Sequence, residues 1–123
     1  MIIGIGTDLI ELNRIEAILK NKGDSFLNRI LTEKEIERCP LHPKRKVEYI
    51  AGRFAGKEAV AKALATGIGN KLSWQDIEIT NQTSGKPEVK IFNHHWSDYK
   101  GIIHISISHS KTMALAKVII EER

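Results

Sequence analysis

Two carboxylates occupy positions where acidic residues are unusual. Asp8 interrupts the apolar run MIIGIGTDLI at the start of the chain, and Glu58 lies at the edge of an apolar helical stripe. A charged group is costly to bury unless it is paired or binds a metal. Mg²⁺ is typically held by one or two carboxylates together with substrate phosphates and water. Asp8 and Glu58 could therefore form a magnesium site for a phosphorylated ligand.

The helix around Glu58 also permits a simpler interpretation. Glu58, Lys62 and Thr66 follow one another at intervals of four residues, so they share one helix face. Glu58 and Lys62 could form an exposed ion pair that contributes a few tenths of a kcal/mol, by the usual rule of roughly 0.2–0.5 kcal/mol for such pairs. Alternatively, Glu58 binds a metal while Lys62 faces a phosphate. The helix alone leaves both interpretations open.

A second polar segment lies near the end of the chain. Ser108-His109-Ser110-Lys111-Thr112 separates two predicted strands and combines hydroxyls, backbone donors and a cation. Such a hairpin tip could bind a phosphate. It could equally be an ordinary polar turn, because turns favour these residue types.

The first half of the chain predicts helices after one short strand. Residues 2–5 predict a short buried strand, and the spacing of Leu12, Ile15, Ile18 and Leu19 predicts a helix that ends near Gly23. A further helical turn is predicted over residues 26–30. Thr32 and Glu35 have the spacing of a capping box for the next helix.

The longest predicted helix spans about residues 42–67, with Gly67 as its C-terminal cap. Gly52 and Gly56 lie inside it, although glycine in a helix costs about 1 kcal/mol relative to alanine. We expect close approach of another backbone or of a ligand to compensate.

The second half has the alternation of strands. Strands are predicted at residues 76–80 and 88–92 around a turn at 83–87, and again at 102–108 and 113–120, the last being apolar on both faces and therefore central. Residues 93–100 fit either a loop or a short helix. Together these elements predict one α+β domain over residues 1–123, with a long helix packed on a largely antiparallel sheet.

Composition restricts the partners and the compartment. The net charge is +4 and the sequence pI is about 9.3, which favours a nucleic acid, a phosphorylated cofactor or an acidic protein as partner. Cys39 is the single cysteine, so no internal disulfide is possible. Neither a signal peptide nor a membrane span is visible. We therefore expect a cytoplasmic protein without membrane association.

Four motifs resemble one enzyme family along essentially the whole chain. They are Gly4-Ile5-Gly6-Thr7-Asp8, the helical RFAGKEA of residues 53–59, Gly85-Lys86-Pro87 and the SISHS of residues 106–110. In order and spacing they resemble the holo-[acyl-carrier-protein] synthases, the small bacterial 4'-phosphopantetheinyl transferases. The resemblance implies the fold of that family. It also implies transfer of 4'-phosphopantetheine from coenzyme A to a serine of apo acyl carrier protein in fatty acid biosynthesis, with release of adenosine 3',5'-bisphosphate.

The resemblance also implies roles for individual residues. Asp8 and Glu58 would bind Mg²⁺, Lys62 would add positive charge near the phosphates, and the serine proton would pass to a metal-bound water or to Asp8. Coenzyme A would contact residues from three regions of the chain, namely Arg45, Arg53 and Lys62, then Gly85, Lys86 and Pro87, then Ser108, His109 and Ser110.

Two expectations concern larger partners. The resemblance implies a docking surface for an acidic carrier-protein helix, formed by Arg14, Ile18, Lys22, Phe26 and Arg29, and a homotrimer with active sites between subunits. The main alternative is a small basic nucleic-acid-binding module without catalysis. That alternative explains the net charge and the Lys44-Arg45-Lys46 run, but not the carboxylates at Asp8 and Glu58. The aromatic content of 6% also leaves few platforms for base stacking, so no nucleic-acid partner is expected.

Overall fold

The computed structural model describes residues 1–93, 96 and 101–123. The prediction for residues 93–100 therefore falls almost entirely outside the described residues. Within the described ranges, no helix is long and apolar enough to cross a membrane.

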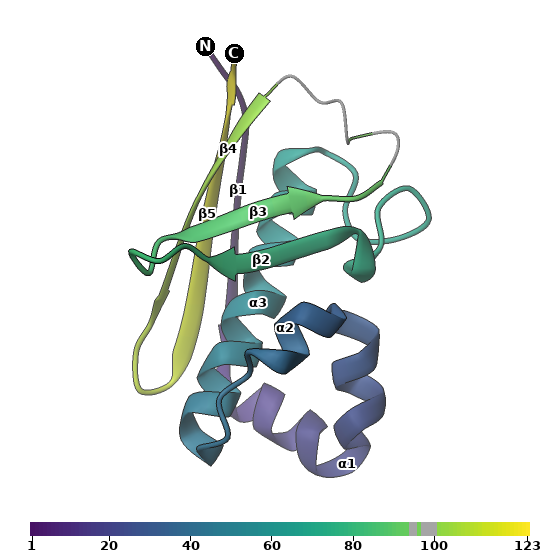
Figure 1. The fold of residues 1–123 in the computed structure, drawn as a ribbon, viewed down its shortest axis with the longest axis vertical. Helices are drawn as coiled ribbons and strands as arrows, with labels where there is room; N and C mark the ends of the chain where they lie inside the picture. The colour runs from purple at the N-terminus through teal and green to yellow at the C-terminus, as the bar shows by residue number, and fades with distance from the viewer. Residues whose placement is uncertain (94–95, 97–100) are drawn as a thin grey trace.

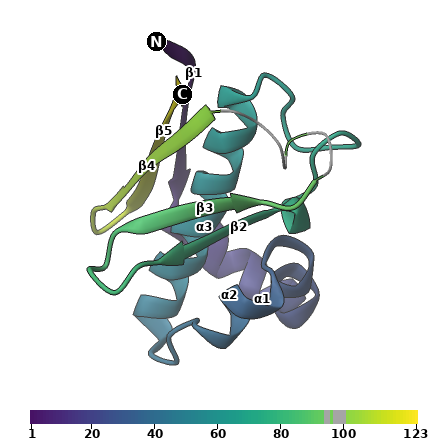
Figure 2. The same ribbon diagram turned by 45° about the horizontal axis from the view of Figure 1, so that its top comes forward.

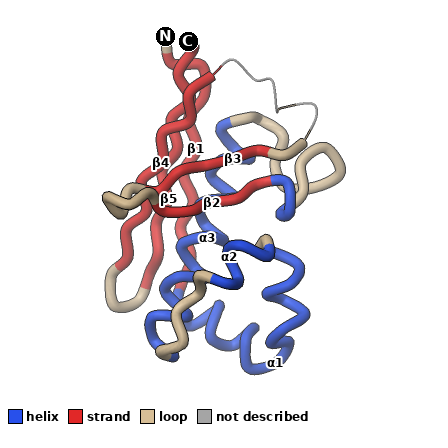
Figure 3. Tube along the Cα trace, in the orientation of Figure 1, coloured by secondary structure: helices blue, strands red, loops and turns tan. Residues whose placement is uncertain are grey.

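In the described residues, one strand begins the chain, three α-helices follow it, and the remaining strands come after a short 3₁₀ turn (Figures 1 and 3). The elements are β1 Ile2–Glu11, α1 Leu12–Ile30, α2 Glu33–Glu37, α3 Pro43–Ala63, the 3₁₀ turn η1 Trp74–Asp76, β2 Ile77–Asn81, β3 Pro87–Ile91, β4 Gly101–His109 and β5 Met113–Glu122. This confirms the predicted α+β class.

The strands form two antiparallel sheets around the long helix. One sheet has the order β1-β5-β4, so the strand that was predicted to be central is central, and β2 pairs with β3 in a separate hairpin. Helix α3 packs along the three-stranded sheet, and the β2–β3 hairpin crosses α3 on another side (Figures 1 and 2). Helices α1 and α2 lie together beside α3, and Glu35 of α2 contacts Lys57 beyond the middle of α3.

Strand β1 is longer and more exposed than the sequence suggested. It continues from Ile2 to Glu11, and Asp8 lies opposite Ala116 inside the ladder rather than beyond the strand end. Alternate residues face α3, while Ile5 and Leu9 on the other face are 61% and 58% exposed. The prediction of a short buried strand was wrong, because only one face of β1 is covered.

Glycines on β1 allow α3 to lie unusually close to the sheet. A Cβ atom at Gly4 would overlap the carbonyl oxygen of Ala63, and one at Gly6 would overlap that of Ala59. Both overlaps are with backbone, which cannot rotate away as a side chain does. The GIG sequence therefore sets the distance between the strand that carries Asp8 and the helix that carries Glu58.

The glycines of α3 are compensated by side chains of the sheets. A Cβ atom at Gly52 would lie 3.1 Å from Ile107 Cγ2, and one at Gly56 would lie 2.6 Å from Ile79 Cδ1. The close approach that we predicted is present, and the neighbouring atoms of the protein are isoleucine methyl groups rather than backbone.

Helix ends follow the sequence signals with one exception. Gly23 adopts φ 43° and kinks α1 where an end was predicted, and the predicted capping box of Thr32 and Glu35 is present. Helix α3 ends at Ala63, earlier than predicted. Ala65, with φ 62°, is the first left-handed residue after it, and Gly67 follows with φ 65°.

Strand β2 is buried on both faces, although its alternation predicted a half-buried strand. Glu78 and Thr80 are each only 7% exposed, and Ile77 and Ile79, which alternate with them, are fully buried. The reason lies in the loop before α2, because Thr32 Oγ1 donates a hydrogen bond of 2.7 Å to Glu78 Oε2. A polar partner permits burial that alternation alone would not predict.

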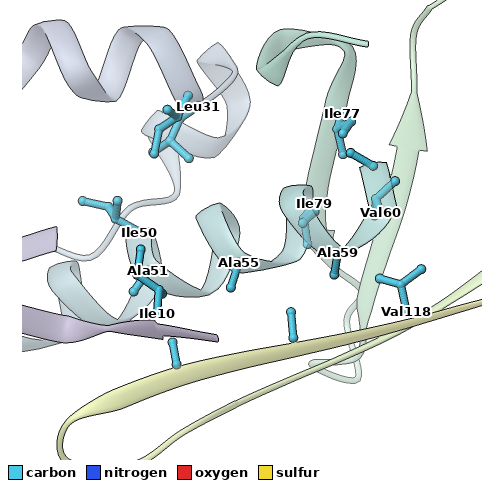
Figure 4. Close-up of a cluster of buried hydrophobic side chains, with 14 of the residues drawn as sticks. Ile10, Leu31, Ile50, Ala51, Ala55, Ala59, Val60, Ile77, Ile79 and Val118 are labelled. Carbon is cyan, nitrogen blue, oxygen red and sulfur yellow. The ribbon is translucent and has the colours of Figure 1, made fainter. Parts of the chain in front are cut away.

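The apolar core surrounds α3. Figure 4 shows Ala51, Ala55 and Ala59 directed from α3 toward the three-stranded sheet, with Ile50 and Leu31 on the opposite side of the helix. Small residues on the sheet side match the close approach that the β1 glycines allow. Larger side chains fill the space between α3 and the other helices.

A buried ion pair joins α3 to α2. Lys57 and Glu35 have fully buried side chains, and Lys57 Nζ lies 2.6 Å from Glu35 Oε1. Lys57 also donates to the carbonyl oxygens of Ile30 at 2.7 Å and Trp74 at 3.0 Å. Burial lowers the pKa of Lys57, and the Glu35 carboxylate opposes that shift.

Glu35 is satisfied on every side as well. Its Oε1 accepts a hydrogen bond of 2.8 Å from the Thr32 N–H, and its Oε2 accepts one of 2.7 Å from the Ile79 N–H. One carboxylate thus connects the start of α2, the interior of α3 and strand β2. A buried pair of this kind stabilises the fold only while both partners are present.

We predict that Lys57→Met destabilises the fold by about 3–5 kcal/mol, because it leaves the Glu35 carboxylate buried without its counter-charge. Urea unfolding followed by circular dichroism measures this effect. The double variant Lys57→Met/Glu35→Gln should recover part of the loss, since the uncompensated charge is gone. Lys20→Met is the matched control, because Lys20 is 75% exposed, and it should change stability little. A Lys57→Met protein as stable as the Lys20→Met protein would contradict this role.

Candidate metal and phosphate site

Asp8 and Lys62 face each other across the contact between β1 and α3. Lys62 Nζ lies 3.0 Å from Asp8 Oδ1 and donates a second hydrogen bond of 3.0 Å to the Thr7 carbonyl oxygen. The Asp8 side chain is 17% exposed and that of Lys62 is 51% exposed. Lys62 therefore forms an ion pair with Asp8, and it also lies close enough to Glu58 to lower the pKa of that carboxyl.

Glu58 belongs to the same cluster. Its pKa is raised above the ordinary value, first by burial and second by the negative charge of Asp8, while Lys62 lowers it. Two carboxylates close enough to repel each other are a common feature of cation sites, since a cation relieves both the repulsion and the loss of hydration.

The donor set fits Mg²⁺ better than metals that need an all-protein cage. Among the described residues, no group of three or more His, Cys, Asp and Glu side chains could hold a metal. Two carboxylates beside a partly exposed lysine are sufficient for Mg²⁺, which keeps several waters and shares ligands with phosphates. Asp8 and Glu58 are the residues that would hold it.

A separate cleft of about 300 Å³ lies against α3 beside β4 and the β2–β3 hairpin. Five residues that the family resemblance assigned to coenzyme A line it, although they come from three distant parts of the sequence. These are Arg45, Arg53, Gly85, Pro87 and His109. The remaining lining residues were not predicted, and they are Glu48, Tyr49, Gly52, Asn81 and Ile107.

Arg53 gives this cleft a preference for anions. Its side chain is only 8% exposed, its guanidinium lies 4.1 Å from the centre of the Tyr49 ring, and its Nη2 lies 3.5 Å from Asn81 Oδ1. Its buried Nε has no hydrogen-bond partner in the part of the chain that the structure describes. A buried cation with an unused donor is suited to binding a phosphate oxygen.

Tyr49 connects the cleft to the buried ion pair. Its hydroxyl donates a hydrogen bond of 2.6 Å to the Glu35 carbonyl oxygen. The aromatic face that supports Arg53 is therefore fixed by the same segment that holds Lys57. Tyr49 precedes Arg53 by one helical turn, and this spacing is the signal by which the sequence could have indicated it.

Four predicted coenzyme A residues lie outside the lining of the cleft, and one of them, Lys62, pairs with Asp8 instead. Lys86 is exposed in the β2–β3 turn, and Ser108 is on the outward face of β4. Ser110 Oγ accepts hydrogen bonds from the backbone N–H groups of Thr112 at 3.3 Å and Met113 at 3.1 Å. Ser110 thus stabilises the turn between β4 and β5, as expected if residues 108–112 form an ordinary polar turn.

The metal cluster and the cleft lie on different flanks of α3. Asp8 belongs to the β1 edge of the sheet, while the cleft adjoins β4 at the other edge. On α3 itself, Glu58 and Arg53 are separated by five residues, which places them roughly 140° apart around the helix axis. The family resemblance implied active sites between subunits, and within one chain the structure places the two carboxylates and Arg53 on different flanks of α3.

The predicted docking surface is only partly exposed. Arg14, Lys22 and Arg29 on α1 are exposed, and Ile18 is half-buried. Phe26 is buried, with its ring centre 6.3 Å from that of Phe54. Phe26 therefore belongs to the core, and its placement on the docking surface is corrected. Helical position could not separate it from Ile18, because the kink at Gly23 rotates the second segment.

Comparison with known proteins identifies the family. Residues 4–116 match the family model of the 4'-phosphopantetheinyl transferase superfamily. The chain is 52% identical over its whole length to a holo-[acyl-carrier-protein] synthase of Oceanobacillus iheyensis, of which it covers 99%. It is 53% identical over 98% of its length to one from Geobacillus sp. strain WCH70, of which it covers 98%.

Solved structures agree with these relatives. A holo-(acyl-carrier-protein) synthase from Bacillus anthracis, in complex with CoA (3',5'-ADP), superposes with a TM-score of 0.88 at 48% identity, covering 100% of this chain and 99% of that one. The Helicobacter pylori enzyme in complex with coenzyme A gives a TM-score of 0.84 at 35% identity, with coverage of 95% and 99%. The chain therefore belongs to the 4'-phosphopantetheinyl transferase superfamily and, within it, to the holo-[acyl-carrier-protein] synthase family of enzymes.

Proposed function

We propose that this enzyme transfers the 4'-phosphopantetheine group of coenzyme A to a serine of apo acyl carrier protein in fatty acid biosynthesis, in the cytoplasm and with Mg²⁺. The observation that carries the proposal is the cluster of Asp8, Glu58 and Lys62, which is suited to a metal-bound pyrophosphate. The coenzyme A complexes of the relatives from B. anthracis and H. pylori support the choice of co-substrate.

The reaction needs positioning and charge neutralisation more than covalent catalysis. The serine oxygen forms a bond to the phosphorus that carries pantetheine, the bond from that phosphorus to the bridging oxygen breaks, and the serine proton is lost. Adenosine 3',5'-bisphosphate leaves with the bridging oxygen. Negative charge grows on phosphate oxygens and on the leaving group, and cations placed around them lower the barrier.

Asp8 and Glu58 hold Mg²⁺ in this proposal. When bound, Mg²⁺ supplies Lewis acidity and a fixed template for the pyrophosphate. Lys62 is half exposed in the same cluster, so its ammonium can turn from Asp8 toward a phosphate oxygen. Burial and the negative charge of Asp8 raise the pKa of Glu58, so protons compete with the metal for this carboxylate up to a higher pH than they would for an ordinary glutamate.

The cleft on the other flank of α3 binds the nucleotide end of coenzyme A. Arg53 and Arg45 supply cations, and Gly85 and Pro87 form one wall. The volume of about 300 Å³ is at the lower limit of typical small-molecule sites, so it suits a part of coenzyme A better than the whole molecule.

A second copy of the chain completes the site. The metal cluster and the cleft face different directions in one chain, so we propose that coenzyme A lies between the cleft of one copy and the carboxylates of another. The outward face of the β1-β5-β4 sheet offers apolar surface for assembly, since Ile3, Ile5, Leu9, Ile102 and Leu115 are each at least 41% exposed. An exposed apolar patch of this kind usually marks an interface, and we propose a homotrimer.

Acyl carrier protein docks on α1. Arg14, Lys22 and Arg29 are exposed cations along this helix, and Ile18 adds partly exposed apolar surface. Charges at the rim of an interface mainly raise the association rate and select the partner. Phe26 is left out of this surface because it is buried.

We predict that incubation with coenzyme A, Mg²⁺ and an apo acyl carrier protein increases the carrier's mass by one phosphopantetheine group, and that EDTA abolishes the increase. Glu58→Gln should lower turnover by about 100-fold or more, because a metal ligand typically provides several kcal/mol of charge stabilisation. Mass spectrometry of the carrier measures both. No mass increase with several carriers would contradict the proposed function.

We predict that Glu58→Gln remains folded, and thermal unfolding at pH 7 and pH 4 tests this. Because the folded-state pKa of Glu58 is raised, its ionised form is disfavoured by folding, and this destabilisation is present only above its ordinary pKa. The neutral variant should therefore melt at an equal or slightly higher temperature at pH 7, by about 2 °C or less for a partly exposed group, and without that advantage near pH 4. If Glu58→Gln melted at a much lower temperature than the intact enzyme, its loss of activity would be explained by unfolding.

We predict that mixing two inactive variants restores transferase activity, because the proposed site spans two copies of the chain. Glu58→Gln lacks a metal ligand and Arg53→Gln lacks the buried cleft cation. After the two are mixed and allowed to exchange subunits, about a quarter of the interfaces in a random assembly join an intact Glu58 to an intact Arg53. Activity should rise toward that fraction, while each variant carried alone through the exchange stays inactive. No recovery, despite demonstrated exchange, would place both halves in one chain.

We predict that Arg14→Glu raises the KM for acyl carrier protein by about tenfold while leaving the KM for coenzyme A nearly unchanged, because the charge lies on the carrier's docking surface. Steady-state kinetics with each substrate varied in turn measures this. Lys90→Glu, on exposed β3, is the control with the same change of charge. Equal effects of Arg14→Glu on both KM values would count against the docking surface.

A further inference from the structure

One carboxylate stands in a cleft that is otherwise suited to anions. Glu48 lines the cleft beside Arg45, Arg53 and His109, and no other described lining residue is acidic. An acid at this position opposes phosphate binding unless it has another function. The proposed transfer reaction gives it none.

Glu48 faces the histidine of the hairpin tip. Glu48 Oε2 lies 3.7 Å from His109 Nδ1, and the Glu48 side chain is 19% exposed while that of His109 is 50% exposed. The contact joins the second turn of α3 to the last residue of β4. The separation is that of an ion pair and is longer than a hydrogen bond.

Glu48 is the acidic side chain that faces the His109 ring in the described part of the chain. The hairpin backbone is already closed, because the Ser110 N–H donates to the Met113 carbonyl oxygen at 2.9 Å and Ser110 Oγ accepts from the Met113 N–H. Most charged residues around the pair are cations. They are Arg45 and Arg53 in the cleft and Lys20, Lys44 and Lys111 in the adjoining groove. The groove also contains Glu16, which forms an ion pair with Lys20. Glu48 lines both spaces and is the acid that faces the ring.

We propose that Glu48 is a positioning residue for His109. A carboxylate that faces Nδ1 favours the proton on that nitrogen and turns Nε2 toward the cleft, since the partner of one ring nitrogen sets the role of the other. The ring nitrogen that meets the nucleotide end of coenzyme A is then fixed before binding. This inference rests on the proposed function for the identity of the ligand, but the coupling between Glu48 and His109 does not depend on it.

A double-mutant cycle tests the coupling through binding. Isothermal titration calorimetry with adenosine 3',5'-bisphosphate compares the intact enzyme with Glu48→Gln, His109→Gln and the double variant. Glu48→Gln should weaken binding by about fivefold, a typical size for coupled neighbours, although it removes a negative charge from an anion site. The double variant should bind no more weakly than His109→Gln. Additive losses, or tighter binding by Glu48→Gln, would overturn the proposal.

A spectroscopic measurement separates positioning from a structural effect. In ¹⁵N NMR spectra of the enzyme without nucleotide at pH 8, the His109 ring should carry its proton on Nδ1, and Glu48→Gln should move a large part of it to Nε2. Glu16→Gln is the control in the adjoining groove and should leave both the tautomer and binding unchanged. An unchanged His109 tautomer in Glu48→Gln would overturn the proposal. Absence of adenosine 3',5'-bisphosphate binding by the intact enzyme would instead count against the proposed function, and the tautomer measurement would still decide the role of Glu48.

Discussion

The buried ion pair of Lys57 and Glu35 is the constraint on which the arrangement of the helices depends. An ammonium and a carboxylate without solvent access persist only when every donor and acceptor is satisfied. Lys57 meets this requirement with the carbonyl oxygens of Ile30 and Trp74, and Glu35 meets it with backbone N–H groups of Thr32 and Ile79. The end of α1, the start of α2, the η1 turn and β2 are thereby fixed around the middle of α3. Lys57 precedes Glu58 in the sequence, so the same pair also fixes the part of α3 that presents Glu58, the proposed metal ligand.

Close packing determines the other side of α3. Gly4 and Gly6 allow the helix backbone to approach β1, and the alanines of α3 leave no bulk between them. This short distance places Lys62 Nζ 3.0 Å from Asp8 Oδ1 and brings Glu58 near Asp8, and burial together with the Asp8 charge raises the pKa of Glu58. The functional cluster is therefore a direct consequence of packing between a glycine-containing strand and an alanine-rich helix. A larger residue in either element would separate the two carboxylates.

Division of the site between two flanks of one helix explains several otherwise unrelated features. Helix α3 presents the two carboxylates on one flank and the arginine cleft on another. The two regions face different directions, so a molecule bound to both would lie between two copies of the chain in this proposal. Assembly through the exposed apolar face of the sheet would bring complementary flanks together and would cover Ile5, Leu9 and Leu115. The basic charge of the chain is also distributed, with cations in the cleft and along α1, in agreement with an anionic co-substrate and an acidic partner.

The sequence by itself determined most of the elements and the family. Helical spacing, the capping box at Thr32 and strand alternation indicated the α+β architecture, because these signals are local, and four short motifs carried the resemblance. Only the tertiary structure decided what each charge contacts. Lys62 pairs with a residue 54 positions away, Lys57 and Glu35 are buried together, and Phe26 turns into the core after the kink at Gly23. Burial and long-range contacts depend on how elements pack, which periodicity does not encode, and for that reason the division of the site between two flanks of α3 became visible only in the fold.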